Sequence, residues 1–448
     1  MIRSPVAQRR NAVSEITELI TGWTILALTP TLSSGSELLF RLDGQASDTL
    51  FGSAVTSIGD VDGDGVPDFA VGAPLTLGPG GNGYLDGRVL VFSGASKALL
   101  HELNPLRHRG FFGGTLAAAG DLDGDGVPDL IIGAPYTPGD NFYGVGSVLA
   151  FSGATGKLLL EFLGKEGGTY MGSAVDAIGD LDEDGVPEIL IGIPRGMGGG
   201  PDGGGVVTVQ SGANGARLYE FDGHASGDYL GTAVAGLGDL DGDGVPDLLL
   251  GAPNASPGGL AQAGLVQLRS GASGQILFEL EGAEARAFFG QVVANVHDID
   301  GDGVDDFAIG APSAIPGGLQ DAGSVFVYSG ATAELLYRWD GTSGFDAFGS
   351  AIGGGGDVDG DGVPDIVVGA PYASPGGVLG AGSAFIFSGA TGELLLRWDG
   401  EELDAALGAS VAIVGDLYGD GRAEVIVGAP YASPGGQRGA GSVFALSF

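Results

Sequence analysis

The sequence has no cysteine among its 448 residues, which excludes disulfides and thiol chemistry. It also has little positive charge, since only 18 residues are Lys or Arg against 56 that are Asp or Glu. No basic stripe suggests binding to DNA or RNA. No apolar run approaches the roughly 18 to 20 residues of a membrane-spanning helix. We therefore expect no nucleic-acid partner and no membrane span, and a fold stabilised by packing and by metal.

The acids that are present recur in a fixed string of nine residues. Its first copy reads Asp60-Val61-Asp62-Gly63-Asp64-Gly65-Val66-Pro67-Asp68. The first acids of the seven copies are Asp60, Asp121, Asp180, Asp239, Asp298, Asp357 and Asp416, so the spacing is 61 residues once and then 59 residues five times. A fixed period of this length predicts a repeat architecture.

The net charge of −38 is concentrated in these strings. Positions 1, 3, 5 and 9 of the seven copies hold 27 of the 56 acids, which leaves 29 acids against 18 bases, or about −11, for the rest of the chain. A diffuse acidic surface would favour solubility, whereas seven compact clusters favour the binding of cations.

Four short strands are expected in each repeat. In the sixth copy these are residues 334–339 as an outer strand, then 347–352, 366–368 and 383–387 as the innermost, second and third strands of the next sheet. The chain has 90 Gly and 22 Pro, and the glycines recur at the same positions from copy to copy beside such apolar runs. This pattern indicates turns between short strands. We predict an all-β protein, a seven-bladed β-propeller of four-stranded antiparallel blades.

The frame of the repeat predicts how the ring closes. The array begins with an outer strand around residues 38–42 and ends with a third strand at 442–446, so the last blade lacks an outer strand of its own. The N-terminal strand of the array completes that blade and removes two exposed sheet edges. The expected domains are a propeller at residues 36–448 and an N-terminal extension at residues 1–35.

Three interpretations of residues 1–35 stay open. They form a tail, a spare strand at residues 23–28 that pairs with a neighbouring molecule, or a signal peptide. Arg3, Arg9 and Arg10 precede the apolar stretch as in a signal peptide, but Glu15 and Glu18 interrupt its apolar region.

Each acidic string has the ligands of a calcium loop. Acids stand at positions 1, 3, 5 and 9, Gly stands at position 6, and the carbonyl of position 7 adds a further oxygen. Calcium prefers such clusters of hard oxygen ligands, whereas magnesium demands stricter octahedral geometry. The predicted ligands are Asp60, Asp62, Asp64 and Asp68; Asp121, Asp123, Asp125 and Asp129; Asp180, Asp182, Asp184 and Glu188; Asp239, Asp241, Asp243 and Asp247; Asp298, Asp300, Asp302 and Asp306; Asp357, Asp359, Asp361 and Asp365; and Asp416, Asp420 and Glu424.

We expect up to seven structural Ca²⁺ ions. The seventh site is the weakest, because Tyr418 replaces an acid; the third carries Glu188 in place of Asp and an additional Glu183. A dissociation constant near 0.1 mM in millimolar calcium would contribute roughly 1.4 kcal/mol per site. Submicromolar calcium would leave such sites mostly empty, so an extracellular, cell-surface or periplasmic setting is implied.

Two further motifs accompany each acidic string. An aromatic or apolar residue plus Gly precedes it, and Gly-Ala-Pro follows it, with Ile193 varying the third copy. The first motif is Phe51-Gly52, Phe112-Gly113, Met171-Gly172, Leu230-Gly231, Phe289-Gly290, Phe348-Gly349 and Leu407-Gly408; the second starts at Gly72, Gly133, Gly192, Gly251, Gly310, Gly369 and Gly428. Over residues 36–448 the chain resembles the FG-GAP repeat family and is similar to the seven-bladed propeller of integrin α subunits and its bacterial relatives.

The resemblance implies a secreted binding or adhesion module, with a protein or glycan ligand on the face opposite the calcium loops. That face would be built from loops such as residues 104–110, 222–228 and 75–87. Integrin-like propellers bind calcium in only some blades, whereas nearly all loops are complete here.

Two other functions remain open for this sequence. A glycan-binding propeller is the first alternative, because Trp339 and Trp398 offer stacking surfaces, although their outer-strand position favours packing between blades. A structural or self-assembling scaffold is the second. We predict no enzyme, since His101, His108, His224 and His297 are the only histidines and no nucleophile stands beside a base.

Overall fold

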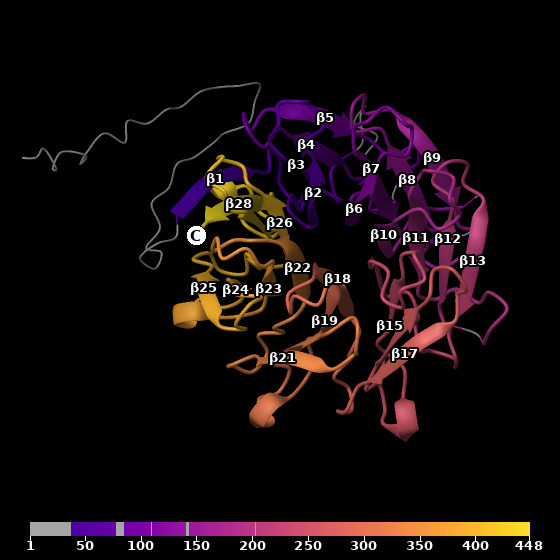
Figure 1. The fold of residues 1–448 in the computed structure, drawn as a ribbon. Coiled ribbons are helices and arrows are strands. Elements are labelled where there is room, and N and C mark those ends of the chain that lie inside the picture. Colours follow the sequence, from indigo (N-terminus) through magenta and orange to yellow (C-terminus); the bar gives the residue numbers. More distant parts are fainter. Residues whose placement is uncertain (1–36, 78–84, 109, 140–142, 202) are drawn as a thin grey trace, which may run out of the picture.

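The computed structural model describes residues 37–77, 85–108, 110–139, 143–201 and 203–448. These residues form seven four-stranded antiparallel sheets arranged in a ring (Figure 1). The predicted seven-bladed β-propeller is confirmed. Within the described ranges no helix is long and apolar enough to cross a membrane. The interpretations of residues 1–35 lie outside the described residues.

In blades 1 to 6 the strands follow one another in chain order from the ring axis outward, and in blade 7 the outer strand is β1. The innermost strands are β2 (Val55–Gly59), β6 (Thr115–Gly120), β10 (Ala174–Ile178), β14 (Ala233–Gly236), β18 (Val292–His297), β22 (Ala351–Gly356) and β26 (Ser410–Gly415). The second strands are β3 (Asp68–Gly72), β7 (Asp129–Ala134), β11 (Glu188–Ile193), β15 (Leu248–Ala252), β19 (Asp306–Ala311), β23 (Asp365–Ala370) and β27 (Glu424–Ala429).

The third strands are β4 (Val89–Phe92), β8 (Ser147–Phe151), β12 (Val206–Gln210), β16 (Leu265–Arg269), β20 (Ser324–Tyr328), β24 (Ser383–Phe387) and β28 (Ser442–Ser447). The outer strands are β5 (Leu99–Leu103), β9 (Leu158–Leu163), β13 (Arg217–Asp222), β17 (Ile276–Glu281), β21 (Leu335–Asp340), β25 (Leu394–Asp399) and β1 (Glu37–Asp43). Blades 1 to 6 start at β2, β6, β10, β14, β18 and β22, and blade 7 consists of β26, β27, β28 and β1.

The ring closes as the sequence predicts. Strand β1 pairs with β28 in antiparallel register, from Glu37 opposite Ser447 to Asp43 opposite Ser442. The two ends of the described chain therefore share one blade, as Figure 1 shows where β1 and β28 lie side by side near the C-terminus.

The predicted position of the innermost strand was wrong by four residues. The sequence predicts residues 347–352, whereas β22 covers Ala351–Gly356. The Phe-Gly motif lies in a turn before the strand, because Ala347 and Gly349 have φ angles of +52° and +89°. The Phe348 N–H donates to the Ala322 carbonyl of the preceding blade at 2.9 Å. The motif is thus a contact between blades rather than part of a strand.

The glycine of the Gly-Ala-Pro motif is required, because neighbouring blades approach each other closely at this position. A Cβ added to Gly369 of the sixth Gly-Ala-Pro would lie 1.9 Å from the carbonyl oxygen of Gly408, which belongs to the next blade. The same clash recurs between blades 7 and 1, where a Cβ on Gly428 would lie 2.1 Å from the Gly52 carbonyl oxygen. No larger residue fits without separating the blades.

The hydrophobic core lies between blades rather than within one. The second strands are buried along their length, as expected for strands covered on both faces. One cluster joins Ala70 and Val91 of blade 1 to Leu130 and Ile132 of blade 2, and comparable clusters join other neighbours. After the second strands of blades 4 to 7 the chain forms short 3₁₀ turns: η1 (Pro257–Gly259), η2 (Pro316–Gly318), η3 (Pro375–Gly377) and η4 (Pro434–Gly436).

Candidate metal centres and binding face

The acidic loops join the innermost strand of each blade to its second strand. In six of the blades the ninth residue of the loop is also the first residue of the second strand, as with Asp68 in β3 and Glu424 in β27, and in blade 4 Asp247 directly precedes β15. Because the blades repeat the same strand order around the axis, all seven loops lie on one face of the ring. We call it the acidic face and the other side the opposite face.

The first acid of each complete loop folds the backbone around itself. In loop 1, Asp60 Oδ1 accepts the N–H groups of Gly63 and Asp64 at 2.7 and 3.2 Å, and its Oδ2 accepts that of Gly65 at 2.8 Å. Asp62 Oδ1 accepts the N–H of Asp64 at 3.1 Å. The first acid accepts the equivalent backbone N–H groups in loops 2, 4, 5 and 6. A carboxylate oxygen has more than one lone pair, so these bonds leave it able to bind a cation.

The ninth acid has a second role that the sequence reasoning missed. Asp68 is fully buried. Its Oδ2 accepts the N–H of Val61 at 2.8 Å, and its Oδ1 accepts the N–H of Gly94 at 2.8 Å, in the turn between β4 and β5. Equivalent pairs of bonds are made by Asp129, Asp247, Asp306 and Asp365. The ninth acid therefore ties the acidic loop to the third and outer strands.

Glutamate at the ninth position makes only half of these contacts. Glu188 Oε2 accepts the N–H of Leu181 at 2.5 Å, and Glu424 Oε2 accepts that of Leu417 at 2.6 Å. Oε1 of each side chain is buried and has no hydrogen-bond partner. The additional methylene moves this oxygen away from the position that an aspartate oxygen takes in the other blades.

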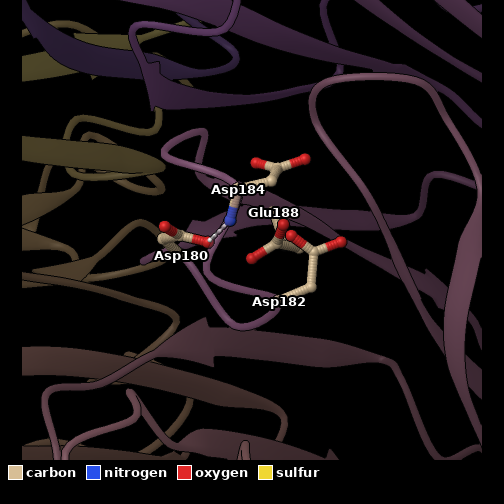
Figure 2. A group of neighbouring side chains, drawn as sticks. All are labelled: Asp180, Asp182, Asp184 and Glu188. Atoms are coloured by element: carbon tan, nitrogen blue, oxygen red, sulfur yellow. Dashed lines mark hydrogen bonds between the residues drawn. The ribbon is translucent and has the colours of Figure 1, made fainter.

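Carboxylate oxygens converge in the loops. In loop 3, Asp180, Asp182, Asp184 and Glu188 each place one oxygen within 4.8 Å of the others. Figure 2 shows these side chains, with the Asp184 N–H donating to Asp180 Oδ1 at 3.0 Å. Ca–O distances of about 2.4 Å allow opposite ligands to lie about 4.8 Å apart. The donor set fits calcium.

Four other loops bring together three of their acids. Positions 1, 3 and 9 converge in loops 1, 2 and 4, and positions 1, 3 and 5 converge in loop 5: Asp60, Asp62 and Asp68; Asp121, Asp123 and Asp129; Asp239, Asp241 and Asp247; Asp298, Asp300 and Asp302. The fifth-position acids Asp64, Asp125 and Asp243, and the ninth-position Asp306, lie outside these groups. The fifth-position carboxylate accepts the N–H of position 7 instead, as Asp64 does from Val66 at 2.9 Å.

Burial raises the pKa of every ninth-position carboxyl, and neighbouring carboxylates of the same loop raise it further. The pKa is raised to about 6 for Asp129, Asp247, Asp306 and Asp365, to about 7 for Glu188 and Glu424, and in the same direction for Asp68. Uncompensated negative charge is thus costly at these positions. A bound cation would remove that cost.

The opposite face carries a cavity of about 420 Å³. Its lining comes from five blades and includes Ser53, Phe111, Gln291, Tyr372 and Tyr431, which places it over the ring axis. Tyr372 and Tyr431 are 63% and 52% exposed. A hollow lined by exposed aromatic rings is typical of a ligand-binding surface.

An arc of aromatic rings in contact with one another borders this cavity on blades 2 to 4. Tyr136 packs edge-on against Phe111 and Tyr170, with centroid distances of 5.5 and 5.4 Å. The Arg195 guanidinium lies 5.2 Å from the Tyr170 ring and 5.5 Å from the Tyr229 ring. We call these five residues the aromatic arc.

The backbone of the aromatic arc is strained. Phe111, Tyr170 and Tyr229 have φ angles of +59°, +58° and +59°, which bulky residues rarely adopt. Sequence reasoning missed the arc, although each of these aromatics stands directly before the aromatic or apolar residue plus Gly. The binding loops predicted at residues 104–110 and 75–87 are described only in part, without residues 109 and 78–84.

Each of the four histidines lies close to a backbone or side-chain group of the propeller itself. His101 Nε2 lies 2.8 Å from the Gly153 carbonyl, His108 Nδ1 2.6 Å from an Asp86 carboxylate oxygen, His224 Nε2 3.0 Å from the Gln267 amide nitrogen, and His297 Nδ1 3.6 Å from Asp305. These partners are carbonyl, carboxylate and amide groups.

Both tryptophans singled out as glycan-stacking candidates pack between blades. Trp339 stacks on Phe387 at a centroid distance of 4.1 Å and donates its indole N–H to the Gly392 carbonyl at 3.0 Å. Trp398 is 8% exposed and lies edge-on to Phe444 at 5.0 Å. The packing role expected from their outer-strand position is confirmed.

Comparison with known proteins agrees with this architecture. A family model described as FG-GAP repeat matches residues 51–92, 112–151, 230–268, 289–328, 348–387 and 407–446, which lie in blades 1, 2, 4, 5, 6 and 7 and make up just over half of the chain. Among curated relatives, the chain is 33% identical to integrin alpha-V of Gallus gallus over 216 residues, 45% of this chain and 20% of the relative.

Two further relatives extend the similarity. Integrin alpha-5 of Xenopus laevis is 32% identical over 219 residues, 45% of this chain and 20% of the relative. Integrin alpha-8 of Gallus gallus is 30% identical over 294 residues, 58% of this chain and 26% of the relative. The matched part of the chain thus spans about a fifth to a quarter of the length of these curated relatives.

Proposed function

This chain belongs to the FG-GAP repeat family, and from that premise we propose that it is a calcium-stabilised propeller that binds a protein or cell-surface ligand outside the cell. In this proposal Ca²⁺ binds in acidic loops 1 to 6, which have all four acids, and has a structural role. The ligand binds on the opposite face. The protein is not an enzyme.

Two features of one acidic loop together support calcium binding: its carboxylate oxygens converge, and one of its acids is buried. In loop 3 four carboxylates contribute oxygens within 4.8 Å of one another, and the ninth acid, Glu188, has a buried oxygen without a hydrogen-bond partner. Hard oxygen ligands and a high negative charge favour calcium over softer metals. Such sites fill in millimolar calcium, which supports an extracellular, cell-surface or periplasmic location.

The observation that supports ligand binding is the axial cavity, which is lined by the exposed Tyr372 and Tyr431 and has the aromatic arc beside it. Exposed Tyr and Arg side chains are enriched where proteins bind one another. The histidines contact carbonyl, carboxylate and amide groups, and the acids are assigned to metal. Binding is therefore better supported than catalysis.

Calcium is tested by thermal unfolding of the full chain in millimolar calcium and in excess chelator, with ion content measured in parallel. We expect a lower melting temperature in chelator, because the ions bind only the folded loops. An unchanged melting curve together with the absence of bound ions would refute the calcium assignment.

Ligand binding is tested by cell adhesion to surfaces coated with the protein in calcium. We expect Tyr372→Ser and Tyr431→Ser to reduce adhesion at least about tenfold, the effect of losing one or two aromatic anchors. The matched control is Leu335→Ser, an exposed apolar residue on outer strand β21, and it should adhere as the unchanged protein does. Equal adhesion by all variants would place the ligand elsewhere.

A further inference from the structure

Loop 7 differs from all the other loops at positions 3, 7 and 8, and the differences at positions 3 and 7 change the charge of the loop. Tyr418 replaces the acid at position 3, and Arg422 replaces the Val at position 7 of the other six copies. Loop 7 also lies at the seam of the ring, because blade 7 is the blade that β1 completes. Both departures therefore fall where the chain closes on itself.

A lysine from blade 1 reaches this loop. Lys97 lies in the turn between β4 and β5 with a φ of +62°, where the equivalent turns of blades 2, 3, 4 and 6 have Gly. Its ammonium lies 4.8 Å from the centre of the Tyr418 ring and 5.0 Å from that of Phe40, and it donates to the Gly94 carbonyl. Tyr418 is thus an aromatic partner for a cation in a loop where the other copies have an acid.

Lys97 also faces the acids of two loops. Burial lowers its pKa to about 8, and the carboxylates of Glu424, Asp64 and Asp68 act in the opposite direction. The ammonium is therefore charged at neutral pH and lies near the ninth acid of loop 7 and two acids of loop 1. Favourable charge interactions of this kind are those that a metal ion would otherwise supply.

Arg422 extends from loop 7 toward blade 6. Its guanidinium donates to the backbone carbonyl of the C-terminal Phe448 at 2.9 Å. Its Nε lies 3.2 Å from where a Cβ on Gly360 of loop 6 would be, and its charge lowers the otherwise raised pKa of Asp359. Arg422 thus joins the end of the chain to the neighbouring acidic loop.

The two bases change the charge of loop 7. Its acids are Asp416, Asp420 and Glu424, so with Lys97 and Arg422 the net charge is −1, against −4 from the four acids of a complete loop. We propose that Lys97 and Arg422 take the place of calcium at loop 7, so that the propeller binds six ions and its seam is held by cations of the chain itself. This inference rests on the proposed function for the other six loops.

The arrangement separates ring closure from metal binding. Removal of calcium loosens six hairpins, but the contacts of Lys97 and Arg422 at the seam remain. The ring therefore stays closed while its blades become less stable.

The first test counts bound calcium on the full chain by native mass spectrometry or equilibrium dialysis with calcium alone. Six ions are expected at saturation, and seven would overturn the inference. No bound ion would refute the proposed function itself, and the role of Lys97 would then be decided by the second test, which needs no metal.

The second test uses Lys97→Met in metal-free protein, with hydrogen exchange of the β1 and loop 7 amides as the measurement. We expect about tenfold faster exchange there, equivalent to about 1.4 kcal/mol of local stability. Lys157→Met is the matched control, because Lys157 is exposed and lies one residue further along the equivalent turn of blade 2. Equal exchange in both variants would overturn the inference.

The third test rebuilds a complete loop. Tyr418→Asp combined with Arg422→Val and Lys97→Gly restores the residues of the other copies, and the triple variant should bind one more ion than the unchanged chain. An unchanged ion count would contradict the proposal that the two bases replace calcium at loop 7.

Discussion

At the scale of single residues, the acids of one loop divide into two groups. The first, third and fifth acids lie at the surface and bond to their own loop. The ninth is buried and bonds to a separate turn of the blade. Loss of a surface acid and loss of the ninth acid should therefore have different consequences.

We expect Asp247→Asn to destabilise the protein by about 2 kcal/mol in chelator, because the amide oxygen replaces only one of the two carboxylate oxygens, and the NH₂ group cannot accept the other of the Leu240 and Gly271 N–H groups. Asp241→Asn, in the same loop but exposed, should reduce only the stabilisation by calcium. Urea unfolding with and without calcium separates the two effects. Equal losses for both variants in chelator would contradict this division.

A substitution that removes a methylene should stabilise blade 3. Glu188→Asp is expected to add about 1 kcal/mol, because the shorter carboxylate can accept a backbone N–H from the turn after β12, as Asp129 does from Gly153 at 2.9 Å. Urea unfolding in chelator measures the change. Asp129→Glu is the reverse variant and should lose a similar amount; a gain from it would refute the explanation.

The sequence predicted the surface acids better than the other site residues. Acids that alternate in one short loop must lie close together, so their spacing alone indicates a cation site. The burial of the ninth acid could not be predicted, because its Gly94 partner lies 26 residues further along the chain. Lys97 could not be assigned to loop 7 at all, since more than 300 residues separate it from Tyr418.

At the scale of elements, the period of the sequence predicted the number of blades and the closure by β1. It placed the innermost strand too early, because a Phe-Gly pair beside small residues has the composition of a strand. Only the contact of Phe348 with the preceding blade shows that the motif is a turn. Contacts between blades are not local, so the pattern of one repeat does not reveal them.

Removal of β1 should open the ring. A chain lacking residues 1–43 loses the buried Phe40 and Leu42 side chains, worth about 4 kcal/mol, and exposes the edge of β28. We expect a lower melting temperature and self-association, measured by light scattering. A chain lacking residues 1–36 keeps β1 and is the control; identical behaviour of the two would contradict closure by β1.

At the scale of the whole molecule, the ninth-position carboxyls set a pH dependence whose sign depends on calcium. In metal-free protein their pKa values of about 6 and about 7 exceed the value of about 4 in an unfolded chain. The folded state then binds more protons than the unfolded state, so stability falls as the pH rises from about 4 to about 7. With calcium the ions require ionised carboxylates, and stability should rise over the same range.

Melting temperatures at pH 5 and pH 7.5 test this prediction, using protein freed of metal by dialysis and the same protein in millimolar calcium. The metal-free protein should melt at the higher temperature at pH 5, and the calcium-loaded protein at pH 7.5. The same sign of change in both samples would contradict the coupling of these carboxyls to calcium.

The register of the closing strands determines how the molecule responds to mechanical force. Glu37 pairs with Ser447, so the two ends of the ring leave it side by side on the acidic face. Tension applied between the termini would load the β1–β28 hydrogen bonds one at a time, as in unzipping, rather than all together in shear. The first bonds to bear that load lie beside Phe448, which Arg422 holds, so the resistance of the propeller to pulling is set at its seam.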